Sequence, residues 1–296
     1  MKHFLAVLLA LPALATAKPP STPIPIPPDI RVVKDLSVLD PQRKEKADLY
    51  YPQNIPPGTI LPAVIVIHGG GFNDGDKARR REVSICSDLV RHGYAALSIN
   101  YRLWSKGIRN PTWPQSLHDA KTAVRWLRKN ADSLGIDPNN IGALGGSAGG
   151  NLAAMLALTN PEDGLDPASP LAEISAKVNC AVDLYGAVDL INYHDMKMFL
   201  KTREQDPAAY IKASPITYAG NSDAPLLIVH GTADDVVKPS QSIALAEKLK
   251  AAGSEHELIL VDGGLHTFDL NPPQMDLKPA VIGFLNKHLK PNPVTP

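Results

Sequence analysis

Short apolar runs alternate with stretches of helical periodicity along this 296-residue chain, and this alternation limits its possible folds more than any other feature. The run at 63–68 is apolar almost throughout, as is typical of a strand buried on both faces. Strands are expected at 30–39, 46–51, 63–67, 94–99, 140–144, 178–185, 225–230 and 255–261, the first two as a hairpin. Helices are expected at 116–130, 149–158, 240–252 and 276–289. This order predicts an α/β fold with a mainly parallel sheet and helices on both faces.

Charge and cysteine content narrow the classes of function. Lys and Arg number 30 and Asp and Glu also 30, so the chain lacks the basic surplus that nucleic-acid binding needs. Cys86 and Cys180 both lie in apolar periodic stretches, which favours buried thiols, and a single disulfide is the alternative. The histidines show no HxH or HxxxH spacing and no cysteine pair beside them, so no metal site is expected.

The N-terminus has the pattern of a signal peptide. Lys2 and His3 precede an apolar run at 4–15, and residues 15–17 (Ala-Thr-Ala) supply a small-x-small cleavage site. The run is shorter than the roughly 20 residues that span a bilayer, so a retained anchor is the weaker alternative. We therefore expect a signal peptide at 1–17, a proline-rich leader at 18–29, a catalytic domain at 30–290 and a flexible tail at 291–296. The protein is expected to be secreted or periplasmic, without a membrane contact after cleavage.

The segment GGSAGG at 145–150 lies between the predicted strand at 141–144 and an apolar helix. Ligands of such sheets bind at the carboxyl ends of the strands. A sharp strand-to-helix turn needs small neighbours around its central residue, and it would expose Ser147 beside a helix N-terminus, where negative charge is favoured. Ser147 is therefore the predicted nucleophile, and a glycine-rich packing turn is the alternative.

The segment HGGGF at 68–72 follows the strand at 63–67. Bare glycines leave backbone N–H groups available to stabilise the oxyanion formed during acyl transfer. The predicted donors are Gly69, Gly70, Gly71 and the amide of Ala148. A phosphate-binding loop is the alternative, although no G-K-[ST] follows. His68 is expected to be a structural hydrogen-bonding residue.

Asp234 and His266 each follow one of the last two predicted strands. The order Ser, Asp, His is the one expected for this architecture. An imidazole with a pKa of about 6.5 suits the general base, and an acid beside it holds the tautomer. Asp235 is the second candidate for the acid of the triad, and Asp189 is the third.

Taken together, the segments HGGGF, GGSAGG, HGTADDVV (230–237) and GGLHTF (263–268) resemble the α/β-hydrolase superfamily, in particular the esterase and lipase branch that carries HGGG. The resemblance runs from about residue 46 to about residue 290. The stretch WPQSLHDAKTAVRW (113–126) and DPNNI (137–141) also resemble the carbohydrate-esterase-like subgroup that contains bifunctional acetylxylan/feruloyl esterases. The resemblance implies an α/β-hydrolase fold with an eight-stranded, mainly parallel sheet.

The N-terminal region departs from the pattern of hormone-sensitive-lipase-like relatives, which usually carry a helical cap there. Residues 18–62 are instead proline-rich and then strand-like, so little or no cap domain is expected. The loops at 102–113 and 192–218 would be the only cover of an open cleft. Phe72, Trp104 and Trp113 are the aromatic residues expected to line it and bind substrate.

The resemblance implies a secreted serine carboxylic-ester hydrolase with Ser147, Asp234 and His266 as its triad. Its expected substrates are small esters with short acyl or aromatic groups, and acetyl or feruloyl groups on plant-wall carbohydrate are the narrower hypothesis. No cofactor and no metal is expected, and the oligomeric state is left open. The alternatives are a prolyl-oligopeptidase-like serine peptidase, which usually carries a large additional domain, and a catalytically silent binding protein, which usually lacks the Ser or the His.

Overall fold

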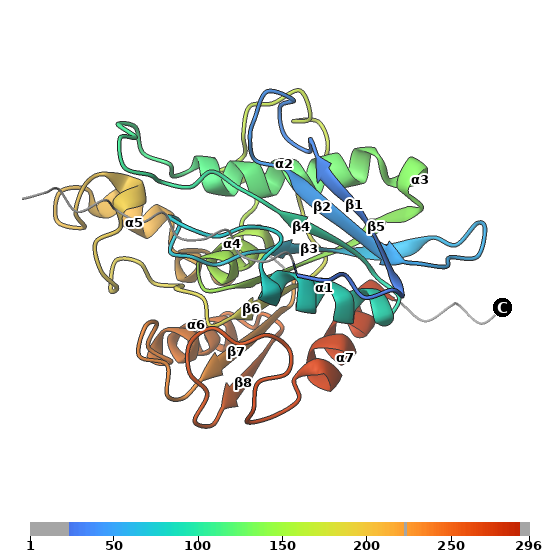
Figure 1. Cartoon of the computed structure of the whole chain (residues 1–296). Coiled ribbons are helices and arrows are strands. Elements are labelled where there is room, and N and C mark those ends of the chain that lie inside the picture. Colours follow the sequence, from blue (N-terminus) through green and yellow to red (C-terminus); the bar gives the residue numbers. More distant parts are fainter. Residues whose placement is uncertain (1–23, 222–223, 291–296) are drawn as a thin grey trace, which may run out of the picture.

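The computed structural model describes residues 24–221 and 224–290. The expected signal peptide, the start of the leader and the tail lie outside these residues. One eight-stranded sheet runs through the molecule, with β1 and β8 at its opposite edges (Figure 1). Its strands are β1 (Ile30–Leu36), β2 (Ala47–Pro52), β3 (Leu61–Ile67), β4 (Ala95–Ile99), β5 (Ile136–Gly146), β6 (Ala181–Leu184), β7 (Leu226–Gly231) and β8 (His256–Val261).

The strand order is β1-β2-β4-β3-β5-β6-β7-β8. The predicted hairpin is present, since β1 pairs with β2 in antiparallel register, and β2 is also antiparallel to β4. All the remaining neighbours are parallel, so β3, β5, β7 and β8 end at the same edge of the sheet. The predicted α/β-hydrolase fold is confirmed, and the segments that carry polar candidates follow these four strands.

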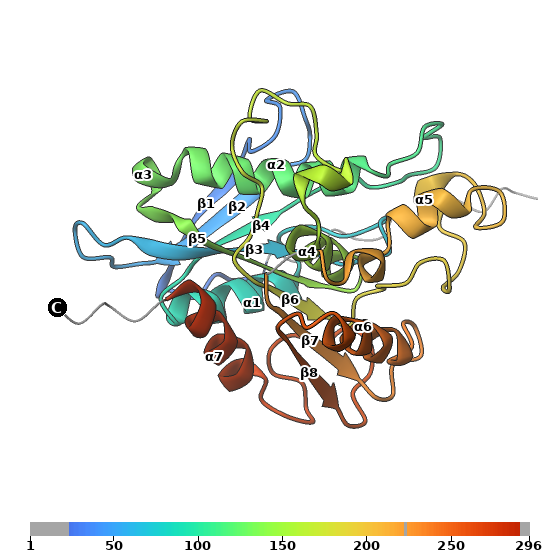
Figure 2. The same cartoon turned by 180° about the vertical axis from the view of Figure 1, so that it is seen from behind.

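Helices cover both faces of the sheet, as predicted (Figures 1 and 2). Buried side chains of α2, α4 and α6 form one core with one face, and those of α1 and α7 form a second core with the other. The strand β3 contributes to both, since Ile65 packs in the first core and Val64 and Val66 pack in the second. The helices are α1 (Arg80–Arg91), α2 (Gln115–Lys129), α3 (Ala131–Leu134), α4 (Ala148–Leu158), α5 (Pro207–Lys212), α6 (Ser240–Ala251) and α7 (Lys278–Leu289).

Helix α1 was not among the helices expected from the sequence, although its apolar residues Ile85, Cys86 and Leu89 pack in the second core. No side chain caps the start of α1, so the usual signal for a helix N-terminus is missing. Two strands differ most in length from the prediction: β5 begins at Ile136, because Leu61 of β3 pairs with that residue, and β6 spans only four residues.

Both cysteines are free, buried thiols in the part of the chain that the structure describes, as the apolar periodicity around them predicts. Burial raises the pKa of each thiol, that of Cys180 to about 12. The described end of the leader packs on the domain, because Ile26 contacts the second core and Asp29 forms an ion pair of 2.8 Å with Arg91. No helix in the described ranges has the length and apolar character needed to cross a membrane.

Candidate active site

Ser147 occupies the sharp turn between β5 and α4, with φ 58° and ψ −119°. A side chain is strained at such a positive φ, and it persists because the surroundings leave the turn no alternative. Gly145 and Gly149 must be glycines because backbone atoms lie too close for a side chain. A Cβ on Gly145 would lie 2.1 Å from the carbonyl oxygen of Gly149, and a Cβ on Gly149 would lie 2.0 Å from the carbonyl oxygen of Ile67. The strained turn therefore lifts the Ser147 hydroxyl above the sheet edge.

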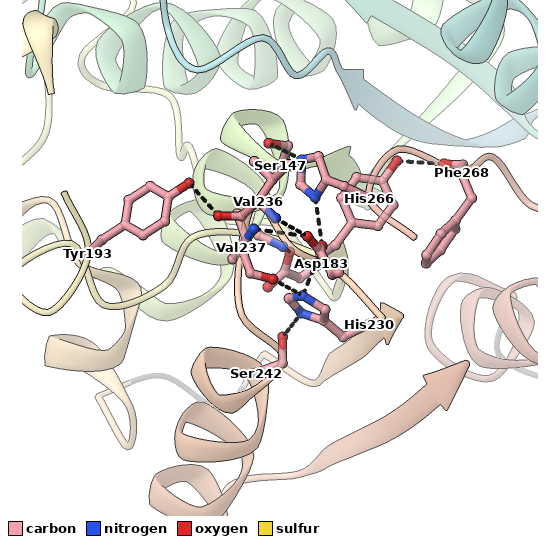
Figure 3. A network of polar contacts seen from close by, with 12 residues as sticks. Ser147, Asp183, Tyr193, His230, Val236, Val237, Ser242, His266 and Phe268 are labelled. Atoms are coloured by element: carbon pink, nitrogen blue, oxygen red, sulfur yellow. Dashed lines mark hydrogen bonds and ion pairs between the residues drawn. The ribbon is translucent and has the colours of Figure 1, made fainter. Parts of the chain in front are cut away.

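His266 contacts Ser147, which lies 119 residues before it in the sequence (Figure 3). It also contacts Asp234, which lies 32 residues before it. The Nε2 atom of His266 lies 3.0 Å from Ser147 Oγ, and its Nδ1 atom lies 2.6 Å from Asp234 Oδ2. The other carboxylate oxygen of Asp234 accepts the backbone N–H groups of Val236 and Val237, each at 2.9 Å. Because both oxygens of Asp234 accept, the His266 proton sits on Nδ1, and Nε2 can accept from the serine hydroxyl.

The rival acids lie elsewhere. Asp235 is exposed, and the Asp189 carboxylate accepts from the side-chain amide of Asn192. The Asp234 side chain, by contrast, has no exposed surface. Of the three candidate acids, only Asp234 is in contact with His266.

A second histidine, His230, also contacts Asp234. Its Nε2 atom lies 2.8 Å from the carbonyl oxygen of Val237, and its Nδ1 atom lies 2.6 Å from Ser242 Oγ (Figure 3). The Nε2 atom also lies 3.2 Å from Asp234 Oδ2. Burial lowers the pKa of His230, which keeps the ring neutral. Since a carbonyl only accepts, Nε2 carries the proton, and His230 anchors the loop that holds the acid. No role was predicted for His230 from the sequence, although it is the first residue of the HGTADDVV motif.

Tyr185 and Arg81 form a further support that the sequence analysis missed. The Tyr185 ring packs edge-on against that of His266, with 4.9 Å between centroids, and its hydroxyl donates to the carbonyl of Phe268 at 2.5 Å. Arg81 Nη1 donates to the same hydroxyl at 2.9 Å, and the guanidinium is ion-paired with Glu82. These contacts connect the His266 loop to the start of α1. No motif marks Tyr185 or Arg81, so sequence alone had no means of finding them.

The glycine loop after β3 borders the Ser147 hydroxyl. Gly70, Gly71 and Phe72 all have positive φ, of 117°, 59° and 60°, and a Cβ on Gly70 would lie 1.9 Å from the carbonyl oxygen of Asp74. Gly69, Gly70, Gly71 and Ala148 all line the same cavity as Ser147. As the first residue of α4, Ala148 has an N–H that no carbonyl of its helix accepts.

His68 lies behind this loop and outside the cavity lining. It is fully buried, stacks on Tyr101 with 4.4 Å between ring centroids, and contacts the carbonyl oxygen of Gly69 through Nδ1 at 2.8 Å. Burial lowers its pKa to about 4, so the ring is neutral. These contacts fit the structural role expected for it.

The cavity around Ser147 has a volume of about 890 Å³ and is lined by the glycine loop, the serine turn, the start of α1 and the segment 193–197. Phe72 lines it, whereas Trp104 and Trp113 do not. Trp113 is buried in the first core against Phe199, and Trp104 lies behind Phe72, donating its backbone N–H to the Phe72 carbonyl at 2.8 Å. The expectation that Trp104 and Trp113 line the cleft was therefore wrong, and no residue of the loop at 102–113 borders the cavity. Packing in the first core holds Trp113 away from it, whereas Trp104 is half-buried outside the cavity lining.

Comparison with known proteins agrees with this arrangement. The model of the BD-FAE family matches residues 47–249. The chain is 33% identical to esterase LipQ of Mycobacterium tuberculosis, covering 77% of this chain and 55% of that protein. It is 29% identical to the ethyl acetate hydrolase of Pseudomonas putida, covering 74% and 70%. The chain thus spans about half the length of the mycobacterial esterases that it matches.

Two solved structures have the same fold. One is a truncated form of a carbohydrate esterase from gut microbiota, with a TM-score of 0.80 and 25% identity over 88% of this chain and 97% of that one. The other is esterase 2 of Thermogutta terrifontis with butyrate bound, with a TM-score of 0.73 and 27% identity over 90% and 97%.

Proposed function

The chain belongs to the BD-FAE family, and from that premise we propose that it is a serine carboxylic-ester hydrolase with Ser147, His266 and Asp234 as its catalytic triad. The observation that carries this proposal is the continuous line of contacts from the Ser147 hydroxyl through both nitrogens of His266 to Asp234. The glycine loop beside the hydroxyl supplies the second requirement of acyl transfer, which is a set of N–H donors for the oxyanion.

In this mechanism the Ser147 oxygen attacks the ester carbonyl while Nε2 of His266 takes the hydroxyl proton. Asp234 holds the opposite nitrogen and stabilises the imidazolium that forms. The amides of Gly69, Gly70, Gly71 and Ala148 stabilise the oxyanion. His266 then returns the proton to the departing alcohol, leaving an acyl-serine. Water, deprotonated by His266, attacks the acyl carbonyl and releases the acid.

For the substrate, we propose short acyl or aromatic esters on carbohydrate, with acetyl and feruloyl groups on plant-wall polysaccharide as the specific candidates. Two observations support this choice: membership of the BD-FAE family and the likeness to a carbohydrate esterase. A cavity of about 890 Å³ accommodates a sugar unit and its acyl group.

The first experiment measures hydrolysis of p-nitrophenyl acetate, butyrate and decanoate by the purified protein. Ser147→Ala is the test variant, and Ser133→Ala, an exposed serine that donates to the Asn130 carbonyl, is the matched control. We expect turnover of acetate and butyrate that is lost in the first variant and kept in the second. Preference for decanoate would contradict the carbohydrate assignment. Absence of turnover in the folded protein would refute the esterase and favour a peptidase or a silent binding protein.

The second experiment tests the substrate class with acetylated and feruloylated xylan fragments. Release of acetate or ferulate is expected. Cleavage of the p-nitrophenyl esters without any release from xylan would leave the esterase standing and remove the plant-wall substrate.

Export is also proposed, on the sequence pattern of residues 1–17 alone. Mass spectrometry of the protein recovered outside the cytoplasm is expected to find a chain that begins at Lys18. A chain that keeps Met1 or Lys2 would contradict the proposal.

A further inference from the structure

The cavity lining holds more cations than anions. Arg79, Arg80, Arg81 and Lys197 border it, against only Glu82 and Asp195. The whole chain has equal numbers of basic and acidic residues, so this local excess does not follow from composition. A cleft lined with one sign of charge raises the local concentration of ligands of the opposite sign.

Both acidic residues of the lining are already paired. Glu82 forms an ion pair with Arg81, and the Asp195 carboxylate lies 3.3 Å from Nε of Arg203, which lies outside the lining. Arg79, on the cationic side, pairs with Asp74 at 2.6 Å.

Two cations remain without an acidic partner in the part of the chain that the structure describes. Arg80 and Lys197 are both exposed and come from two different segments of the lining: Arg80 begins α1, and Lys197 belongs to the segment 193–197. The ammonium of Lys197 lies over the Trp104 ring, 5.0 Å from its centroid, a contact that orders the side chain without neutralising it.

Arg81 is a third cationic side chain of the cavity lining, and Glu82 balances its charge. Its guanidinium lies against the serine turn and the glycine loop, where a Cβ on Gly146 would be 2.7 Å from Nη1 and one on Gly69 3.3 Å from Nη2. Glu82 and Tyr185 engage one N–H on each of its three nitrogens, and a guanidinium has five N–H donors in all. Because the flanking residues are glycines, no side chain separates Arg81 from the cavity.

We propose that this cavity is an acidic-ester site, in which Arg80 and Lys197 bind a carboxylate carried by the substrate and Arg81, whose charge is balanced by Glu82, contributes N–H donors. The inference rests on the proposed esterase function and narrows its substrate class to esters with a carboxylate near the scissile bond. That carboxylate has two chemical sources: the alcohol side, as in a sugar polymer bearing uronic acid, or the acyl side, as in a half-ester of a dicarboxylic acid.

The experiment compares kcat/KM for two matched ester pairs that differ only in charge. The alcohol-side pair is 4-acetoxybenzoate and 4-acetoxybenzamide. The acyl-side pair is mono-p-nitrophenyl adipate and its methyl ester, each corrected for the rate without enzyme. The variants are Arg80→Gln, Lys197→Gln and the double variant. Lys106→Gln is the control, because Lys106 is exposed and lies outside the cavity lining.

We expect the wild type to prefer the anionic ester of at least one pair, and that pair identifies the side that carries the carboxylate. Each single variant should lower the anionic-to-neutral ratio of kcat/KM by about two- to fivefold, the range of an exposed ion pair, and the control should leave it unchanged. Raising NaCl from 20 to 500 mM should lower the ratio in the wild type because exposed charges are screened.

Equal ratios in the wild type, the cation variants and the control would overturn the acidic-ester site. The neutral esters separate this failure from that of the proposed function. If they are hydrolysed in a Ser147-dependent reaction, the esterase stands and only the anionic preference is wrong. If no ester of either pair is hydrolysed, the esterase itself is refuted.

Discussion

Replacing Asp234 by Asn tests the triad with almost no change in shape. The Asp234 carboxylate accepts four groups: the N–H groups of Val236 and Val237 at one oxygen, and His266 and His230 at the other. An Asn has one oxygen and one amino group. If its oxygen keeps the two backbone donors, its amino group faces Nδ1 of His266. That nitrogen must then accept, the imidazole proton moves to Nε2, and Ser147 loses its general base.

The size of the effect follows from the alternative orientation of the amide. If the amide of the Asp234→Asn variant turns to the opposite orientation, its oxygen faces His266 and the proton returns to Nδ1 of that ring. The amino group of the amide then faces the N–H groups of Val236 and Val237, which lose their acceptor. Each buried donor left unsatisfied costs about 1–3 kcal/mol, so the productive arrangement lies about 2–6 kcal/mol higher. At about 1.4 kcal/mol per decade, kcat falls by about 30-fold to 10⁴-fold. The upper end matches the loss of about 10⁴ found when a triad Asp becomes Asn in a serine protease.

The assay is hydrolysis of p-nitrophenyl acetate by Asp234→Asn and by Asp235→Asn, the exposed neighbour, as the control. We expect kcat to fall in the first variant only, with urea midpoints close to the wild type because the loop keeps its backbone hydrogen bonds. A fall of less than tenfold in Asp234→Asn would refute the reasoning. So would a larger loss in Asp235→Asn.

Three further predictions concern the supports of the site. Gly149→Ala places a Cβ 2.0 Å from the Ile67 carbonyl oxygen and so displaces the serine turn, and kcat should fall about 100-fold. The control is Gly283→Ala on α7, where the added Cβ has no atom within 4 Å; its free energy of unfolding, measured in urea, should rise by about 1 kcal/mol. Tyr185→Phe should lower kcat at unchanged KM and lower the free energy of unfolding by about 1–3 kcal/mol, because the buried Phe268 carbonyl loses its donor. The control is Tyr94→Phe, which removes a hydroxyl that donates to Asn286 away from the site; it should change the free energy of unfolding without changing kcat. Burial raises the pKa of Asp183 to about 7 in the folded protein, whereas an unfolded Asp releases its proton near pH 4. Between about pH 4 and pH 7 the folded state therefore binds the additional proton, and the stability of the wild type falls as the pH rises through this range. The free energy of unfolding of Asp183→Asn, relative to wild type, should therefore rise by up to about 4 kcal/mol between pH 4 and 7 and stay level above pH 7, as measured by urea unfolding at several pH values.

Local sequence signals were enough for most of the architecture. The apolar run of β3 is continuous because helices cover both faces of that strand, and the stripe of α2 marks its buried side. Strand ends were harder to place, because β5 extends to Ile136 through its pairing with Leu61, a contact between distant parts of the chain. Helix α1 was not predicted, although Ile85, Cys86 and Leu89 form its buried apolar side.

The candidate site divides in the same way. Ser147, Asp234, His266 and the glycine loop could be identified from sequence because each follows a strand, and parallel strands bring their carboxyl ends to one edge. The sequence also favoured Asp234 over Asp235, because Asp234 is nearer the end of the strand, but only the structure shows that the Asp234 side chain contacts His266 and that Asp235 is exposed.

Tertiary structure alone decided which side chains surround these residues. Arg81 lies 104 residues from Tyr185, and His230 reaches Asp234 only because the loop after β7 folds back on itself. Trp113 has the chemistry of a sugar-binding residue, yet packing against Phe199 holds it in the core. A motif records the backbone geometry that short-range sterics demand, whereas contacts between side chains depend on packing that involves the whole chain.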